Sequence, residues 1–325
     1  MHVPSWLLEP AAVAAFERDG FVIAEGLIDA ELAQHLTERL EAVLAHEYNV
    51  PGGKPDKAPP PRADPRRKPG KQPPPLGGPS KRTIQVVNVW KADASFARLV
   101  RSPELGRAVA TLAGWEGARL ANDQVWAKPP GGAPLAFHRD APYFDFSPPH
   151  VVTVWIALDD MDAELGPLEY AVTPPPPYPS APTRNPTYPP PTPPTFLSQV
   201  GSHRWGDGRV GSANQFFDTD RKGLLRDAAR REGLDPTSLE IRRLAVRCGG
   251  VGIHDGRLWH GSGANTTRDK PRRGLGIHFI PADARFRDAS ADCTLAHQWK
   301  GTNDELPAEH FPVVWQRGAD SCDYK

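Results

Sequence analysis

Cysteine is scarce in this sequence, and the three that occur, Cys248, Cys293 and Cys322, are widely spaced. Their odd number and spacing predict neither a disulfide framework nor a cysteine-rich zinc site. No stretch approaches the roughly 18 consecutive apolar residues of a membrane-spanning helix, and the N-terminus lacks the basic and apolar regions of a signal peptide. The formal net charge is zero, which argues against electrostatic binding to nucleic acid or to an anionic membrane. We therefore expect a soluble cytoplasmic protein with no nucleic-acid partner and no membrane span.

Proline, by contrast, is abundant, with 38 residues concentrated in two segments. Residues 51–82 are rich in Pro, Lys and Arg, and residues 173–199 contain runs of proline; both hold too few apolar side chains to offset the entropy cost of ordering. We expect both segments to be disordered insertions in one catalytic domain spanning 1–325, because loops tolerate added length. Two alternatives stay open: the basic segment contacts an anionic partner, or the P-x-x-P spacings of the second segment bind SH3-like domains.

The remaining sequence predicts helices first and then a long series of strands. The helices are expected at 11–18, 29–46, 95–112 and 220–232, with Asp29 as an N-cap and Ser102-Pro103 as a possible interruption of the third. The strands are expected at 119–127, 134–138, 150–158, 167–172, 239–246, 250–254 and 274–280. This order predicts a mainly β (α+β) protein: an antiparallel double-sheet jelly roll, cupin-like, with N-terminal helices packed on one sheet.

Three residues have the chemistry and spacing of a metal site. His138 and Asp140 stand two apart at the end of an expected strand, so their side chains share a face, and His260 follows 120 residues later. Two histidines and one carboxylate can occupy one face of an octahedral Fe(II) ion and leave the other face open. His-x-Asp alone is weak evidence in a chain with 11 histidines, since a solvated loop is the commoner origin of such a pair. His254 competes with His260 as the distal ligand, while His203 and His278 are interpreted as structural.

Motifs around these residues occur in a recognisable order. They are Phe16–Val22, Gln124–Gly132, Gly166–Tyr170, Gly201–Trp205, His260–Asn265 and Pro271–Phe279. Together they resemble the phytanoyl-CoA dioxygenase family of Fe(II)/2-oxoglutarate-dependent oxygenases over most of the chain, from Phe16 to about Phe286. One departure is that proline-rich sequence separates the third and fourth motifs, which in the family follow each other almost directly. The resemblance implies a double-stranded β-helix in which His138, Asp140 and His260 bind Fe(II), with 2-oxoglutarate and O2 as co-substrates.

The resemblance also suggests residues for the co-substrate. The distal carboxylate of 2-oxoglutarate needs a cation inside an apolar barrel, and a guanidinium can pair with it through two hydrogen bonds. Arg272, 12 residues after His260, is expected to do this, with its neighbour Arg273 as the alternative. Lys128, Trp155 and Ser262 match positions that line the 2-oxoglutarate pocket in relatives.

The expected activity is hydroxylation of a C–H bond in a small organic substrate, with release of succinate and CO2. Asp140 argues against halogenation, because halogenating relatives carry a small residue in place of this carboxylate. The substrate class is left open between an acyl-CoA and a small metabolite. Two alternatives remain: a cupin-type metal dioxygenase that needs no 2-oxoglutarate, and a catalytically silent jelly-roll scaffold with proline-rich arms that bind partners.

Overall fold

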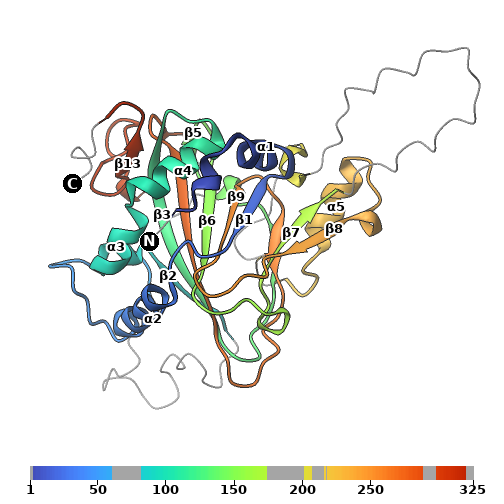
Figure 1. Cartoon of the computed structure of the whole chain (residues 1–325), viewed down its shortest axis with the longest axis horizontal. Helices are drawn as coiled ribbons and strands as arrows, with labels where there is room; N and C mark the ends of the chain where they lie inside the picture. The colour runs from blue at the N-terminus through green and yellow to red at the C-terminus, as the bar shows by residue number, and fades with distance from the viewer. Residues whose placement is uncertain are drawn as a thin grey trace, which may run out of the picture.

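The computed structural model describes residues 3–60, 82–173, 201–206, 216, 218–287 and 298–319. Its largest element is an antiparallel sheet in the order β1–β9–β6–β11–β3–β13, with β2 paired to the other half of the long strand β3 (Figure 1). The strands of this large sheet are β1 (Phe21–Ala24), β2 (Ile84–Val87), β3 (Gly117–Lys128), β6 (Val152–Ala157), β9 (Val251–Asp255), β11 (Arg272–Pro281) and β13 (Val313–Gln316).

A second, smaller antiparallel sheet has the order β4–β10–β7–β8. Its strands are β4 (Leu135–His138), β7 (Leu168–Val172), β8 (Glu240–Arg243) and β10 (His260–Ser262), and a short pair is formed by β5 (Phe146–Ser147) and β12 (Arg285–Phe286). Side chains of both sheets meet in one buried cluster, in which Trp155 of the large sheet lies with Leu168 and Tyr170 of the small sheet. Two antiparallel sheets that enclose a shared interior form a jelly roll, so the predicted fold class is confirmed.

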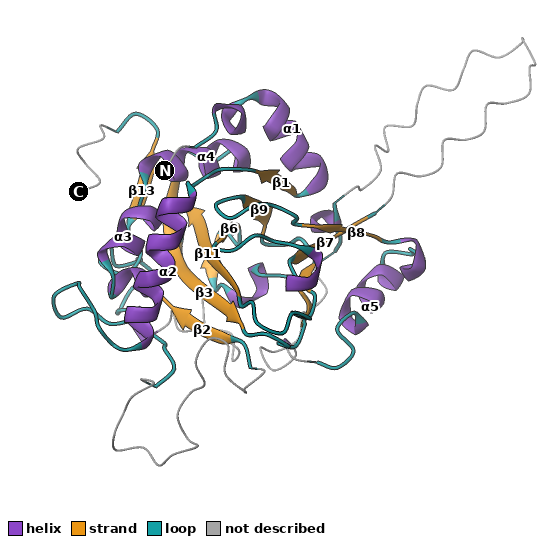
Figure 2. Ribbon diagram, turned by 60° about the horizontal axis from the view of Figure 1, so that its bottom comes forward, coloured by secondary structure: helices purple, strands orange, loops and turns teal. Residues whose placement is uncertain are grey.

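Helices cover the outer face of the large sheet, as Figure 2 shows. They are α1 (Pro10–Asp19), α2 (Ala30–Leu44), α3 (Ala94–Val100) and α4 (Pro103–Ala113), whereas α5 (Gly223–Arg231) lies beside β4 of the small sheet. The expected helix at 95–112 is two helices, because Ser102 caps a new one: its Oγ accepts a hydrogen bond from the Leu105 amide at 3.2 Å. Asp29 caps α2 as predicted. Strands β1, β2, β5, β10, β12 and β13 were not predicted.

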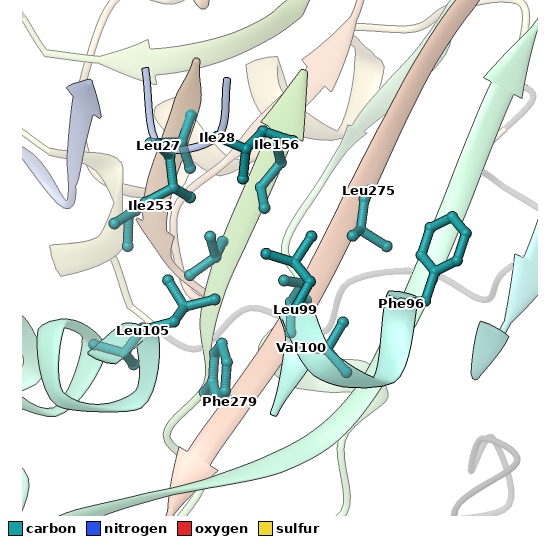
Figure 3. Packing of buried hydrophobic residues seen from close by; sticks show 14 of the residues in the cluster. Leu27, Ile28, Phe96, Leu99, Val100, Leu105, Ile156, Ile253, Leu275 and Phe279 are labelled. Carbon is teal, nitrogen blue, oxygen red and sulfur yellow. The ribbon is translucent and has the colours of Figure 1, made fainter. Parts of the chain in front are cut away.

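Alternation along β6 and β11 separates the core from the interior of the jelly roll. Ile156, Leu275 and Phe279 point outward and pack with helical side chains such as Leu99 and Leu105 (Figure 3). Each fully buried side chain of this kind stabilises the fold by about 1.5–3 kcal/mol. Successive strand residues face opposite sides. The same strands therefore send their intervening residues into the space between the sheets.

The proline-rich segments lie largely outside the described residues. Residues 61–81 and 174–199 are not described, so the predicted disorder there stays a prediction. The prediction does not hold for the start of the first insertion, because Lys57 forms a β-bridge with Val87 and Asp56 binds the Lys91 ammonium at 2.9 Å. None of the described helices has the length and apolar character needed to cross a bilayer.

Candidate active site

The three predicted metal ligands converge where β4 and β10 pair. His260 lies directly opposite His138 in the register of these strands, and Asp140 follows β4 by two residues. Their ligand atoms all lie within 4.8 Å of one another, which makes them a group that could hold a metal ion. The Nε2 atoms of His138 and His260 lie 3.6 and 3.5 Å from the same oxygen of Asp140, Oδ1.

Backbone carbonyls orient both imidazoles. Nδ1 of His138 donates to the carbonyl oxygen of Ala136 at 2.8 Å, and Nδ1 of His260 donates to that of Leu258 at 3.0 Å. With the proton on Nδ1, each Nε2 presents a lone pair toward Asp140. Burial lowers the pKa of both rings, that of His260 to about 4. Both imidazoles are therefore neutral at pH 7, the form that binds a metal.

Asp140 is held through its second oxygen. Oδ2 accepts hydrogen bonds from Oγ1 of Thr153 at 2.7 Å and from Nε2 of His254 at 3.2 Å. Burial alone would raise the pKa of this carboxyl, but His260, His254 and His278 around it hold that pKa well below its ordinary value. The carboxylate is thus ionised and points Oδ1 toward the two ligand imidazoles.

Two further histidines lie beside the predicted ligands. His254, which the sequence left as a competing ligand, contacts Oδ2 of Asp140 and is not part of the converging group. His278, interpreted as structural, has its Nε2 3.7 Å from the same oxygen. The sequence could have indicated that His278 faces the site. It stands six residues after Arg272 on one strand, and residues an even number apart share a face. His203 lies elsewhere, with Nε2 3.2 Å from the carbonyl oxygen of Glu17.

Two buried cations lie on the inner face of the large sheet, next to β10. Lys128 and Arg272 are opposite each other in the β3–β11 register, and both are almost completely buried. The Oγ of Ser262 accepts from Lys128 Nζ at 3.0 Å and from an Nη of Arg272 at 3.3 Å. Burial, with Arg272 nearby, lowers the pKa of Lys128 to about 6, and burial lowers that of Arg272 to about 10.

These cations have no anionic partner among the residues that the structure describes. The neighbouring carboxylates are committed elsewhere: Glu169 pairs with Arg221 at 2.6 Å, and Asp159 pairs with Arg273 at 2.5 Å. The buried Nε of Arg272 also lacks a hydrogen-bond partner. A desolvated guanidinium beside a buried amine is costly without a counter-charge, and a carboxylate-bearing ligand would satisfy both groups.

Trp155 packs beside Arg272 on the inner face of the large sheet. The Arg272 guanidinium stands 5.5 Å from the centre of its ring. The indole lies across β11 where the side chain of Gly274 is missing, since a Cβ there would be 2.0 Å from Cζ2 of the ring. All the residues predicted for the co-substrate, Lys128, Trp155, Ser262 and Arg272, therefore lie together, and Arg273 points away from them.

A comparison with protein families decides which family this site belongs to. The model of the family described as phytanoyl-CoA dioxygenase (PhyH) matches residues 16–172 and 198–274, more than half of the chain. The chain belongs to the phytanoyl-CoA dioxygenase family. As a member, it is an enzyme of the non-haem iron, 2-oxoglutarate-dependent class. A search of curated protein sequences found no significant match.

Solved structures share the fold of this phytanoyl-CoA dioxygenase family member. The 2-oxoglutarate (alpha-ketoglutarate)-dependent epimerase SnoN from nogalamycin biosynthesis is 23% identical, with a TM-score of 0.62 over 94% of this chain and 99% of that one. The carbocyclase SnoK from the same biosynthesis is 20% identical, with a TM-score of 0.63 over 94% and 96%. EctD from S. alaskensis, solved with 2-oxoglutarate and 5-hydroxyectoine, is 17% identical, with a TM-score of 0.60 over 98% and 90%.

Aromatic side chains surround the solvent-accessible side of the metal group. The ring of Phe216 packs edge-on against His138 at 4.5 Å and lies 5.1 Å from Tyr143 and 6.3 Å from Trp126. His138 keeps 13% of its side chain exposed, whereas His254 is 1% exposed, so this family member is open on the His138 side. The sequence did not reveal Phe216, because it belongs to no regular motif and comes from a distant segment.

Proposed function

We propose that this protein is an Fe(II)- and 2-oxoglutarate-dependent dioxygenase that hydroxylates a C–H bond of a small organic substrate. The balanced reaction consumes one O2 and one 2-oxoglutarate and yields the hydroxylated product, succinate and CO2. The observation that carries the proposal is the pairing of two complementary half-sites: neutral imidazoles around one carboxylate, and a buried guanidinium and amine with no anionic partner among the described residues. The first suits a divalent metal, and the second suits a carboxylate.

In this proposal His138, Asp140 and His260 hold Fe(II), and Arg272, Lys128 and Ser262 bind the distal carboxylate of 2-oxoglutarate. Ser262 follows His260 by two residues on β10, a separation of about 7 Å along a strand. That distance suits a five-carbon dicarboxylate that reaches from the metal position to the cations. Trp155, whose ring packs against the Arg272 guanidinium, lines the distal end. Bound iron and 2-oxoglutarate supply the activation of O2, while these residues orient the co-substrate and exclude water from its distal end.

The accessible side of the site indicates the substrate. Phe216 packs against His138, and Tyr143 and Trp126 lie against Phe216. This aromatic cluster beside the metal group favours a small metabolite with an apolar ring over a fatty acyl-CoA.

The test is an anaerobic titration of metal-free protein with Fe(II) and then 2-oxoglutarate, followed by the visible charge-transfer band of a chelated 2-oxo acid. We expect a saturable band in the wild-type protein and none in His260→Ala. On admission of O2, succinate should form in an iron-dependent manner. Iron binding without a band would favour a dioxygenase independent of 2-oxoglutarate. Absence of iron binding would favour the silent scaffold.

A further inference from the structure

The two carboxylate oxygens of Asp140 have different surroundings. Oδ1 faces Nε2 of both ligand histidines, whereas Oδ2 accepts from Thr153 Oγ1 at 2.7 Å and from His254 Nε2 at 3.2 Å. An oxygen with two hydrogen-bond donors has its lone pairs engaged. Only Oδ1 is therefore left for a metal.

We propose that Thr153 and His254 form a clamp that restricts Asp140 to a single metal-binding oxygen. Carboxylates bind metals through one oxygen or through both. A one-oxygen Asp140 with two histidines fills three of six octahedral positions and leaves three, which a chelating 2-oxo acid and O2 require. The inference rests on the proposed function and adds what keeps the third position open. Thr153 and His254 act through Asp140 and are positioning residues.

A hydrogen bond from the Tyr170 hydroxyl fixes the tautomer of His254. Its Nε2 carries the proton donated to Asp140, so its Nδ1 is an acceptor, and the Tyr170 hydroxyl lies 3.3 Å away and donates to it. Tyr170 is completely buried. A Cβ at Gly252 would come within 2.3 Å of its hydroxyl oxygen, so this glycine provides the space for the contact. The direction of donation is therefore Tyr170 to His254 to Asp140.

The clamp and the metal ligands come from different sheets. Thr153 and His254 are cross-strand partners on β6 and β9 of the large sheet, whereas His138 and His260 are partners on β4 and β10 of the small one. Asp140 follows β4 and reaches across to the clamp. Its orientation is thus set by the packing of one sheet against the other, which fixes a side chain more firmly than a loop does.

The experiment measures Fe(II) affinity by anaerobic dialysis, and nitric oxide binding to the Fe(II)/2-oxoglutarate form as a probe of the open position. We expect Thr153→Val and His254→Gln each to weaken Fe(II) binding about 10–100-fold, and to lower the fraction of iron-loaded protein that binds nitric oxide. Thr153→Ser, which keeps the hydroxyl, should retain both properties. His203→Gln, a substitution of a buried histidine away from the site, should match the wild type.

Thr153→Val preserves side-chain volume, so it tests the clamp even if His254→Gln does not fold. Wild-type affinity and nitric oxide binding in Thr153→Val and His254→Gln would overturn the proposal. So would complete loss of iron in His254→Gln with no change in Thr153→Val, because His254 would then be a ligand itself. If wild-type protein binds Fe(II) but shows no 2-oxoglutarate band, the proposed function fails, and the Fe(II) affinities still decide whether the clamp exists.

Discussion

The metal group and the pair formed by Lys128 and Arg272 lie at two ends of one interior. They differ in whether the protein itself supplies partners for their charged groups. Around Asp140, four histidines are neutral and every strong interaction of the carboxylate is made within the protein. Around Ser262, the Arg272 guanidinium and the Lys128 amine are buried with no counter-charge among the described residues. The first end is organised before any ligand arrives, whereas the second is incomplete without one. Binding selectivity for an anion should therefore come mainly from the second end.

The largest effect should come from removing one cation of the pair. Arg272→Leu deletes one partner of a buried charge interaction, a loss of 2–5 kcal/mol, so we expect the Kd for 2-oxoglutarate to rise at least about 30-fold. Arg273→Leu is the matched control, since Arg273 pairs with Asp159 on the opposite face of the strand. The titration that follows the chelate band measures both variants. Equal effects of the two substitutions would contradict the assignment.

An intermediate effect should follow from displacing the Trp155 ring that packs against Arg272. Gly274→Ala places a Cβ 2.0 Å from the Trp155 ring, and overpacking of this kind costs about 1–3 kcal/mol. We expect a lower melting temperature and weaker 2-oxoglutarate binding. In Gly276→Ala the nearest atom would be 3.6 Å away, an ordinary contact, so both properties should stay close to wild type. If both alanines behave alike, the position of the indole does not matter for binding.

The smallest expected effect is the pH dependence of 2-oxoglutarate affinity, which arises at the Lys128 end of the site. Free Lys128, with its pKa near 6, is neutral above that pH, and a bound carboxylate favours its charged form. The complex then holds one more proton, so 2-oxoglutarate affinity should increase as pH falls from 8 toward 6, by at most about tenfold per pH unit.

Binding measured at saturating Fe(II) between pH 6 and 8 tests this dependence. Lys128→Met should flatten the profile and weaken binding, and it should also raise the melting temperature of the ligand-free protein, because a buried amine that resists protonation is removed. A wild-type profile that is flat over this range would show that Lys128 takes up no proton on binding.

Residues on one strand were predictable from their spacing, and groups that meet across strands were predictable only where the family resemblance named them. Alternation separates Arg272 from Arg273, and the His-x-Asp spacing places His138 and Asp140 together. In contrast, the contact of His254 with Asp140 depends on β9 pairing with β6 at the register that sets His254 opposite Thr153. No local pattern encodes that register. The short strand β10 was missed for a related reason, since three residues carry too little periodicity.

Strand β11 lies between β3 and β6, although both of these precede it by a long stretch of chain. During synthesis, the two earlier strands emerge with their adjoining edges unpaired, and unpaired edges are prone to pair with other chains. The central strand that joins them is also the one that carries Arg272 and His278. Assembly of this protein is therefore governed by non-local pairings, which make folding slow, and the Arg272 end of the site does not exist until that late segment has been inserted.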